Sequence, residues 1–261
     1  MSKFLVRTTD GTCETHELNQ EPLAKAGVTP GSTSGDEIIR TNPFRADYIR
    51  SLLGDTQRCM KAAITKISMA MPVVNNNGSS STGLSAFSRD SLMALINTHF
   101  QVDKTPNPGA SLQWLLKIYT TMQSAFLRPG GLWGAFIFDD DPHPEVKQHS
   151  QWYAWTYPGG YYQSGGKTGD YRLDTIYLCA GLDGDIEDQN LQTILHELSH
   201  FVGPASHGSI LDHAYGKVDS FKMKKLTPQQ RLHNAESFGN FAFEAGFGRP
   251  PKYWYDVDDD S

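Results

Sequence analysis

Apolar residues recur at helical spacing along the first half of the chain. Between residues 46 and 70 they repeat every three or four positions, which predicts a helix that Pro72 ends. A second helix is expected after Ser88, whose hydroxyl can cap the first turn. A third is expected over residues 110–127, with Pro129 and two glycines directly behind it. Three helices are therefore predicted between residues 46 and 127.

The pattern changes between residues 132 and 185, where aromatic residues and glycines are frequent. Turn-forming residues divide this section into short segments, which predict strands. Residues 175–180 are a short apolar run typical of a buried strand. Residues 1–42 are poorer in apolar side chains and predict an N-terminal extension, partly disordered or accessory. The remaining chain is predicted to be one α+β domain over residues 43–252, followed by an acidic tail, residues 253–261.

Two helices are expected towards the C-terminus. Residues 188–202 carry apolar side chains around most of the helical circumference, which is typical of a buried helix. The other helix is expected to begin at Thr227, where Gln230 completes a capping box and Pro228 takes the first helical position. It is expected to run to about residue 245 and to end at the glycines 246 and 248.

The buried helix contains the sequence His196-Glu197-Leu198-Ser199-His200, an H-E-x-x-H motif. Residues four positions apart lie on one helix face, so both imidazoles can bind one metal ion. Glu197, next to them, can take a proton from a water molecule that attacks a substrate. Burying these polar groups without partners would be costly, which favours a zinc site over histidines that only complete the core.

A catalytic zinc site needs a third protein ligand and an open position. Three residues are candidates, and each implies a different class of zinc enzyme. A zinc site completed by His207 would resemble that of a metzincin. The metzincin pattern, however, places its third histidine at position 206, which is Ser206 here. Glu236, on a following helix, would resemble a thermolysin-like enzyme. Asp212 is the third candidate.

The motifs taken together resemble those of the aspzincins, the deuterolysin and peptidyl-lysine metalloendopeptidase family. Asp212, Tyr215 and Gly216 match the D-x-x-Y-G that follows H-E-x-x-H in that family, with one additional residue before the aspartate. The resemblance implies a zincin-like fold, in which helices pack on a small twisted sheet and the H-E-x-x-H helix is buried under the active-site cleft. It also implies one zinc ion per chain, bound by His196, His200 and Asp212.

Roles for the remaining site residues also follow from the resemblance. Glu197 would be the general base, and Tyr215 would donate a hydrogen bond to the oxyanion. Glu236 matches an acidic position that contacts the substrate's lysine in the lysine-specific members. The second acidic position of those members is Gly239 here, so Glu236 could instead orient a metal ligand or be an ordinary helix residue. His213 and His207 are expected to be loop histidines close to the ligands.

The net charge and the cysteine content indicate which partners and which cellular compartment to expect. The formal net charge is −6, which is unfavourable for binding to nucleic acid or to anionic membranes. Three scattered cysteines without a C-x-x-C predict reduced thiols. No signal peptide is recognisable, so we expect synthesis in the cytoplasm, with any export by a signal-independent route.

The sequence therefore predicts a zinc-dependent endopeptidase, which could act as a bacterial secreted effector or toxin. Its partners would be a peptide or protein substrate, and an inhibitor, immunity protein or secretion component is conceivable. Two alternatives stay open. One is an effector-type zinc hydrolase acting on cell-wall or other amides. The other is a non-enzymatic binding module with a structural zinc ion.

Overall fold

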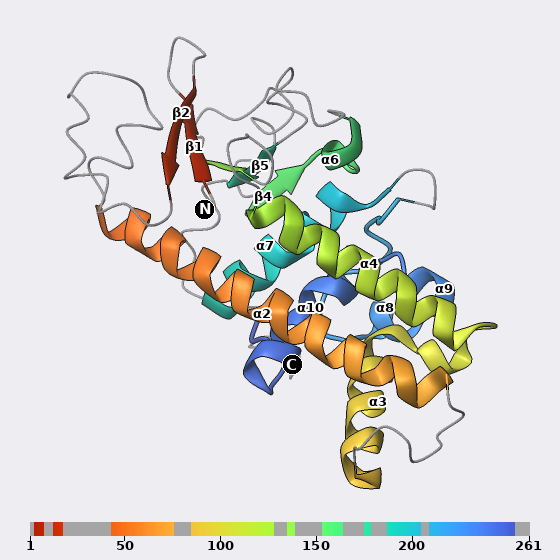
Figure 1. Cartoon of the computed structure of the whole chain (residues 1–261). Coiled ribbons are helices and arrows are strands. Elements are labelled where there is room, and N and C mark those ends of the chain that lie inside the picture. Colours follow the sequence, from red (N-terminus) through yellow and green to blue (C-terminus); the bar gives the residue numbers. More distant parts are fainter. Residues whose placement is uncertain are drawn as a thin grey trace, which may run out of the picture.

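The structure is a computed structural model, in which most of the described residues are helical (Figure 1). It describes residues 3–7, 13–17, 43–75, 85–127, 135–138, 153–163, 175–178, 187–204 and 209–253. The predicted domain limits stay predictions, although two strands of the sheet lie within residues 1–42. None of the described helices is both long and apolar enough to cross a membrane.

Five short strands are paired in the order β2-β1-β3-β5-β4. They are β1 (Lys3–Arg7), β2 (Cys13–Glu17), β3 (Ala135–Phe138), β4 (Ala154–Thr156) and β5 (Thr175–Leu178). The central pairs β1–β3 and β3–β5 are parallel, whereas β2 and β4 pair antiparallel with their neighbours at the two edges. The strand predicted over residues 175–180 is present as far as Leu178, and its last two residues lie outside the described part.

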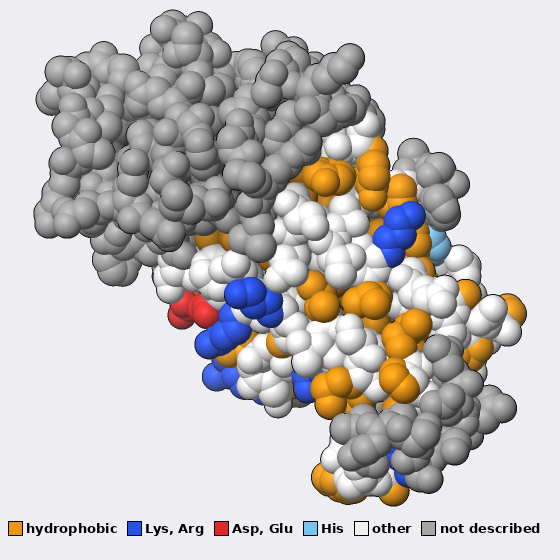
Figure 2. Space-filling model, viewed as in Figure 1, with side chains coloured by type: hydrophobic (Ala, Val, Ile, Leu, Met, Phe, Trp, Pro, Cys, Tyr) orange, Lys and Arg blue, Asp and Glu red, His pale blue; other side chains and the backbone are white. Residues whose placement is uncertain are grey.

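Four helices form the main core. They are α2 (Pro43–Asn75), α4 (Pro108–Leu127), α7 (Glu187–Val202) and α10 (Ala235–Phe247), and the first two run as long neighbours across the view of Figure 1. The helix α7 contacts α2, α4 and α10, and it also contacts strands β4 and β5. It is therefore enclosed from several sides, as its apolar circumference predicted. On the face drawn in Figure 2, the described side chains are mostly uncharged, and Lys and Arg atoms gather over the α2–α10 part.

Five further helical segments complete the helical part of the described chain. They are α3 (Ala86–Phe100), η3 (Val102–Lys104), α6 (Gly160–Gln163), α8 (Phe221–Lys224) and α9 (Pro228–Arg231). The cap of α3 is Ser85, whose hydroxyl accepts from the Ser88 backbone N–H, so the prediction of Ser88 as the cap was wrong. The two serines are three residues apart, and either could cap a helix. The prediction failed because the helix begins one turn earlier than its apolar residues suggest.

Two further predictions about helix ends were wrong. The helix α2 continues through Pro72 to Asn75. Pro72 removes the backbone donor to the Ser68 carbonyl, but it stands three residues before the end of α2, and Val73 directly after it is buried. The single helix predicted from residue 227 to 245 is divided into α9 and α10, with Leu232 to Asn234 between them. The predicted capping box at Thr227 is confirmed. Of the two glycines predicted to end the second helix, Gly248, with φ of 72°, is the cap, whereas Gly246 lies within α10.

Candidate metal centre

The helix α7 supplies two imidazoles from consecutive turns. His196 and His200 are only 5% and 6% exposed, within a helix whose residues from Gln189 to Val202 are all buried except for Thr193. The first turn of α7 is fixed by Asp188. Its carboxylate accepts hydrogen bonds from both terminal guanidinium nitrogens of Arg249 and from the backbone N–H of Lys252. The two histidines are therefore held by a rigid, packed element rather than by a surface loop.

A loop held on the N-terminus of α10 supplies the third group. The Leu211 backbone donates to the His233 carbonyl at 2.8 Å, and its carbonyl accepts from the Ala235 N–H at 3.0 Å. The buried Asn234 side chain accepts from the His213 and Ala214 backbone N–H groups at 2.9 and 3.1 Å. Asp212 lies between these anchored residues, so its carboxylate has a defined position above α7.

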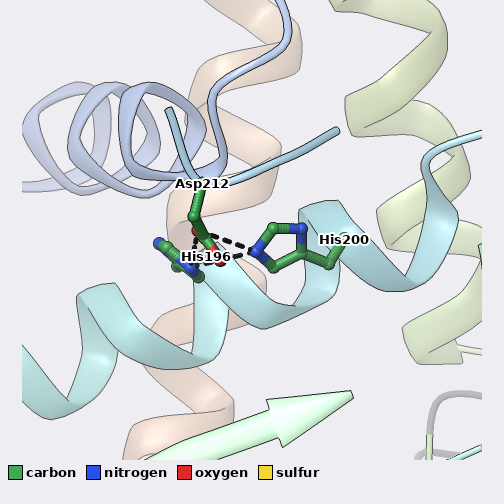
Figure 3. Close-up of side chains that lie close together, drawn as sticks. All are labelled: His196, His200 and Asp212. Carbon is green, nitrogen blue, oxygen red and sulfur yellow. Dashed lines mark hydrogen bonds and ion pairs between the residues drawn. The ribbon is translucent and has the colours of Figure 1, made fainter. Parts of the chain in front are cut away.

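Figure 3 shows the Asp212 carboxylate pointing at both imidazoles. Its Oδ1 lies 3.0 Å from His196 Nε2 and 3.0 Å from His200 Nε2, and the two nitrogens are 3.2 Å apart. Ligand atoms 2.0–2.1 Å from a tetrahedral zinc ion lie about 3.3 Å from one another. The triangle therefore needs to expand by only a few tenths of an ångström to hold such an ion. Among the described residues, this trio is the group of His, Cys, Asp and Glu side chains that could hold a metal ion.

The other nitrogen of each imidazole is also engaged. His200 Nδ1 donates to the Ile210 carbonyl at 2.7 Å, and His196 Nδ1 donates to Glu236 Oε2 at 3.0 Å. A proton on each Nδ1 leaves the Nε2 lone pair of each ring free to bind a metal ion. The hydrogen bonds therefore select the tautomer that a metal site requires.

Glu236 is a buried carboxylate at the base of the site. It is 3% exposed, and its Oε1 accepts from the Gly216 backbone N–H at 2.9 Å and from the Tyr253 hydroxyl at 3.1 Å. The Tyr253 hydroxyl also contacts Asn240 Oδ1, and Asn240 Nδ2 donates to the Gly216 carbonyl. Both oxygens of Glu236 thus have partners within the protein, and this network joins the C-terminal segment to His196.

The electrostatics of the metal-free trio follow from burial and pairing. Burial opposes a positive charge on His196, but hydrogen bonds to the Asp212 and Glu236 carboxylates outweigh it and raise the pKa of His196 to about 10. Burial also opposes the charge on Asp212, yet the two histidines hold the pKa of this carboxyl well below its usual range. The three groups therefore form an ion-paired cluster whose positive charge a metal ion can replace.

Glu197 lies beside His196 and is 8% exposed. Burial raises the pKa of the Glu197 carboxyl, an effect that the neighbouring His196 and His200 oppose. A carboxylate with an elevated pKa is a better proton acceptor near neutral pH than an ordinary surface glutamate.

The remaining predicted site residues differ in their placement. The Tyr215 ring stacks on the His196 ring, with centroids 5.6 Å apart and 13° between the planes, and it is 58% exposed. Burial and the hydrogen-bonded Asp212 carboxylate raise the pKa of its hydroxyl, so the phenol keeps its proton. His213 is exposed and bound to Asn234 through its backbone. His207 lies outside the described residues.

Sequence reasoning missed several residues that hold the site together. They are Ile210, Asn234, Asn240 and Tyr253, of which Tyr253 is buried although it is the first residue of the predicted tail. The one available signal was Asn234, a polar residue two positions before Glu236, whose side chain needs a partner if it is buried. The others act through contacts that join distant parts of the chain.

The chain matches no protein-family model and no curated protein. Among solved structures, a zinc peptidase from Grifola frondosa is similar at 19% sequence identity and a TM-score of 0.39. The match covers 74% of this chain and 95% of that chain. A likeness at this distance carries no argument about the site, so the assignment depends on the geometry of the trio and its partners.

Proposed function

We propose that the chain is a zinc-dependent endopeptidase. The observation that carries the proposal is the triangle of His196 Nε2, His200 Nε2 and Asp212 Oδ1, with edges of 3.0–3.2 Å and with both imidazoles fixed in the ligating tautomer. Two nitrogens and one carboxylate suit zinc, and the three ligands found among the described residues would leave a fourth position open, as catalysis requires. A structural zinc site would be closed by a fourth protein ligand.

The chemistry follows from the groups around the triangle. Zinc, when bound, supplies a Lewis acid that polarises a carbonyl and lowers the pKa of a water molecule. Glu197 takes the proton of the attacking water and later gives it to the leaving amine. The Tyr215 hydroxyl, which keeps its proton and lies against His196, would turn from the Asp212 carboxylate and donate to the oxygen on which negative charge develops.

The finer assignment is to an aspzincin-like enzyme with a zincin-like domain over residues 43–252. The order of His196, His200 and Asp212 along the chain, and Tyr215 three residues later, support it. For Glu236 we favour a positioning role over binding of a substrate lysine, because both of its oxygens are engaged by His196, Gly216 and Tyr253. A peptide or protein is the expected partner.

The test is a digest of a complex peptide library, followed by mass spectrometry of the new termini. Wild type and Glu197→Gln are compared, each with added zinc and with a chelator. Glu187→Gln is the matched control, because it makes the same substitution at an exposed position of α7. New termini that require both zinc and Glu197 support the proposal.

One outcome would overturn it. If folded wild-type protein bound one zinc ion and produced no new termini, a peptidase would be excluded, and amide substrates other than peptides would be tested next. If Glu197→Gln kept wild-type turnover with zinc bound, the proposed role of Glu197 would be wrong.

A further inference from the structure

Exposed apolar side chains gather around the ligand loop. Six large hydrophobic side chains are exposed among the described residues, and three of them, Leu211, Tyr215 and Phe221, lie between residues 211 and 221. Leu211 is 46% exposed and Phe221 is 74% exposed. An exposed apolar group that borders a candidate active site is typical of an interaction surface.

This segment has a net positive charge, whereas the whole chain has a net negative charge. Residues 217–225 contain four lysines and one aspartate, a net charge of 4 − 1 = +3, whereas the whole chain has −6. The side chains of Lys222, Lys224 and Lys225 are exposed. Lys225 Nζ lies 3.7 Å from the centre of the Phe221 ring, so positive charge and apolar surface are adjacent.

The helix α8 and its C-cap residue Lys225 carry these groups, and α8 is anchored to the ligand loop. Met223 is fully buried in a cluster with Ala214 and Leu226, and Ala214 lies between Asp212 and Tyr215. Asn234, which holds the loop, also contacts Met223 Sδ at 3.5 Å. The Met223 carbonyl accepts from the buried Arg231 at 2.7 Å. The exposed lysines on either side of Met223 are therefore fixed relative to the metal centre.

Among the described residues of this segment, lysines outnumber the acidic groups that could bind a substrate cation, and Asp219 is the one exposed acidic side chain that is not a candidate ligand. Within the described residues 209–225 the acidic residues are Asp212 and Asp219, and Asp212 is a candidate ligand. Glu197 and Glu236 are buried, and both oxygens of Glu236 have partners. The net positive charge of the described residues 209–225 thus favours an anionic substrate segment over a lysine side chain at this surface.

We propose that Leu211, Tyr215, Phe221, Lys222, Lys224 and Lys225, here termed the 211–225 surface, bind an acidic segment of the peptide substrate beside the scissile bond. This inference rests on the proposed peptidase function. The lysines attract Asp and Glu side chains of the substrate, and the apolar residues contact its neighbouring apolar side chains. Substrates with acidic residues flanking the cleaved bond are then cleaved in preference to neutral or basic ones.

The experiment uses zinc-loaded full-length protein and peptides with one cleavable core, whose flanking residues are Glu, Gln or Lys. The test variant is Lys222→Glu/Lys224→Glu/Lys225→Glu. The control variant is Lys61→Glu/Lys104→Glu/Lys117→Glu, which makes the same change in net charge at exposed positions on α2, η3 and α4. We expect kcat/KM of wild type and of the control variant to be higher for the Glu peptide than for the Gln and Lys peptides. In the test variant this preference should be about tenfold smaller, a modest change for three lysines because exposed ion pairs are individually weak. High salt should reduce the preference in wild type.

A direct binding measurement separates this inference from the peptidase assignment. Fluorescence anisotropy of the labelled Glu peptide on wild type and on the test variant reports the surface even if no peptide is cleaved. Cleavage without charge preference, or equal binding by both variants, would overturn the inference and leave the proposed function intact. Equal binding of a single-stranded oligonucleotide or of phosphatidylserine vesicles would also overturn it, because the surface would then bind anions of any class.

Discussion

Glu236→Gln tests whether the buried carboxylate determines the metal affinity. In the wild type, Glu236 accepts three hydrogen bonds, from His196 Nδ1 at 3.0 Å, from the Gly216 N–H at 2.9 Å and from the Tyr253 hydroxyl at 3.1 Å. Glutamine has nearly the same shape, but its amide nitrogen cannot accept a hydrogen bond. One side of the new residue therefore faces a donor that it cannot satisfy.

The size of the effect on zinc affinity or stability depends on which donor the amide nitrogen of the new glutamine faces. If the amide nitrogen faces His196, the Nδ1 proton loses its acceptor and the ligating tautomer loses its support, which costs about 10–100-fold in zinc affinity, or roughly 1.4–2.7 kcal/mol. If it faces Gly216, a buried N–H is left unsatisfied, and the free energy of unfolding falls by about 1–3 kcal/mol. Either orientation has a measurable cost, in zinc affinity or in stability.

Zinc affinity is measured by competition with a chromophoric chelator, and the free energy of unfolding of the metal-free protein by urea denaturation. Glu244→Gln is the matched control, because Glu244 is on the same helix and bonds a buried histidine, His99, at 2.9 Å outside the metal centre. If Glu236→Gln kept the wild-type zinc affinity within twofold and lost no stability, the reasoning about the carboxylate would be refuted.

Three further predictions concern the supports of the site. Asn234→Ala removes the acceptor of the His213 and Ala214 N–H groups, so the free energy of unfolding should fall by about 2–3 kcal/mol and zinc binding should weaken; unchanged zinc affinity would show that the loop holds its position without this side chain. Gly203→Ala places a Cβ 2.9 Å from the backbone nitrogen of Ile210, whose carbonyl holds His200, so thermal unfolding should show a loss of about 1–3 kcal/mol, and wild-type stability would contradict the close approach. In the metal-free protein the raised pKa of His196, about 10, has two consequences. Its contribution to stability is complete below its unfolded-state pKa of about 6.5 and is lost as the pH rises through about 10, and zinc affinity should increase by about tenfold per pH unit between about pH 6 and 8 because zinc displaces this proton. A pH-independent zinc affinity, measured by calorimetry, would exclude a protonated His196.

The sequence predicted local features better than long-range ones. The helix with His196 and His200 was predictable because its apolar period and its motif both lie within one segment. The capping box at Thr227 was predictable for the same reason. The break before α10 was not, because Asn234 pairs there with a loop that lies some 20 residues earlier in the chain.

The third metal ligand shows the same division. From the residues alone, His207, Glu236 and Asp212 all stayed open as candidates, and the choice of Asp212 came from the family resemblance. The structure brings Asp212 to the Nε2 atoms of the two imidazoles, whereas Glu236 contacts Nδ1 of His196, the nitrogen that points away from the metal position. Such a distinction depends on which face of α7 meets α10, and the periodicity of either helix alone does not contain it.

The two halves of the metal centre differ in how they are attached to the molecule. His196 and His200 belong to a helix enclosed by the core, whereas Asp212 belongs to a loop held by backbone pairing at Leu211 and by the Asn234 side chain. A metal ion would bridge these two parts, and its removal would weaken the link without exposing the core. Hydrogen exchange should therefore accelerate first in residues 211–225 when zinc is withdrawn, while the amides of α7 stay protected. The ligand loop and α8 would then open together as one cooperative unit, before the enclosed helix α7.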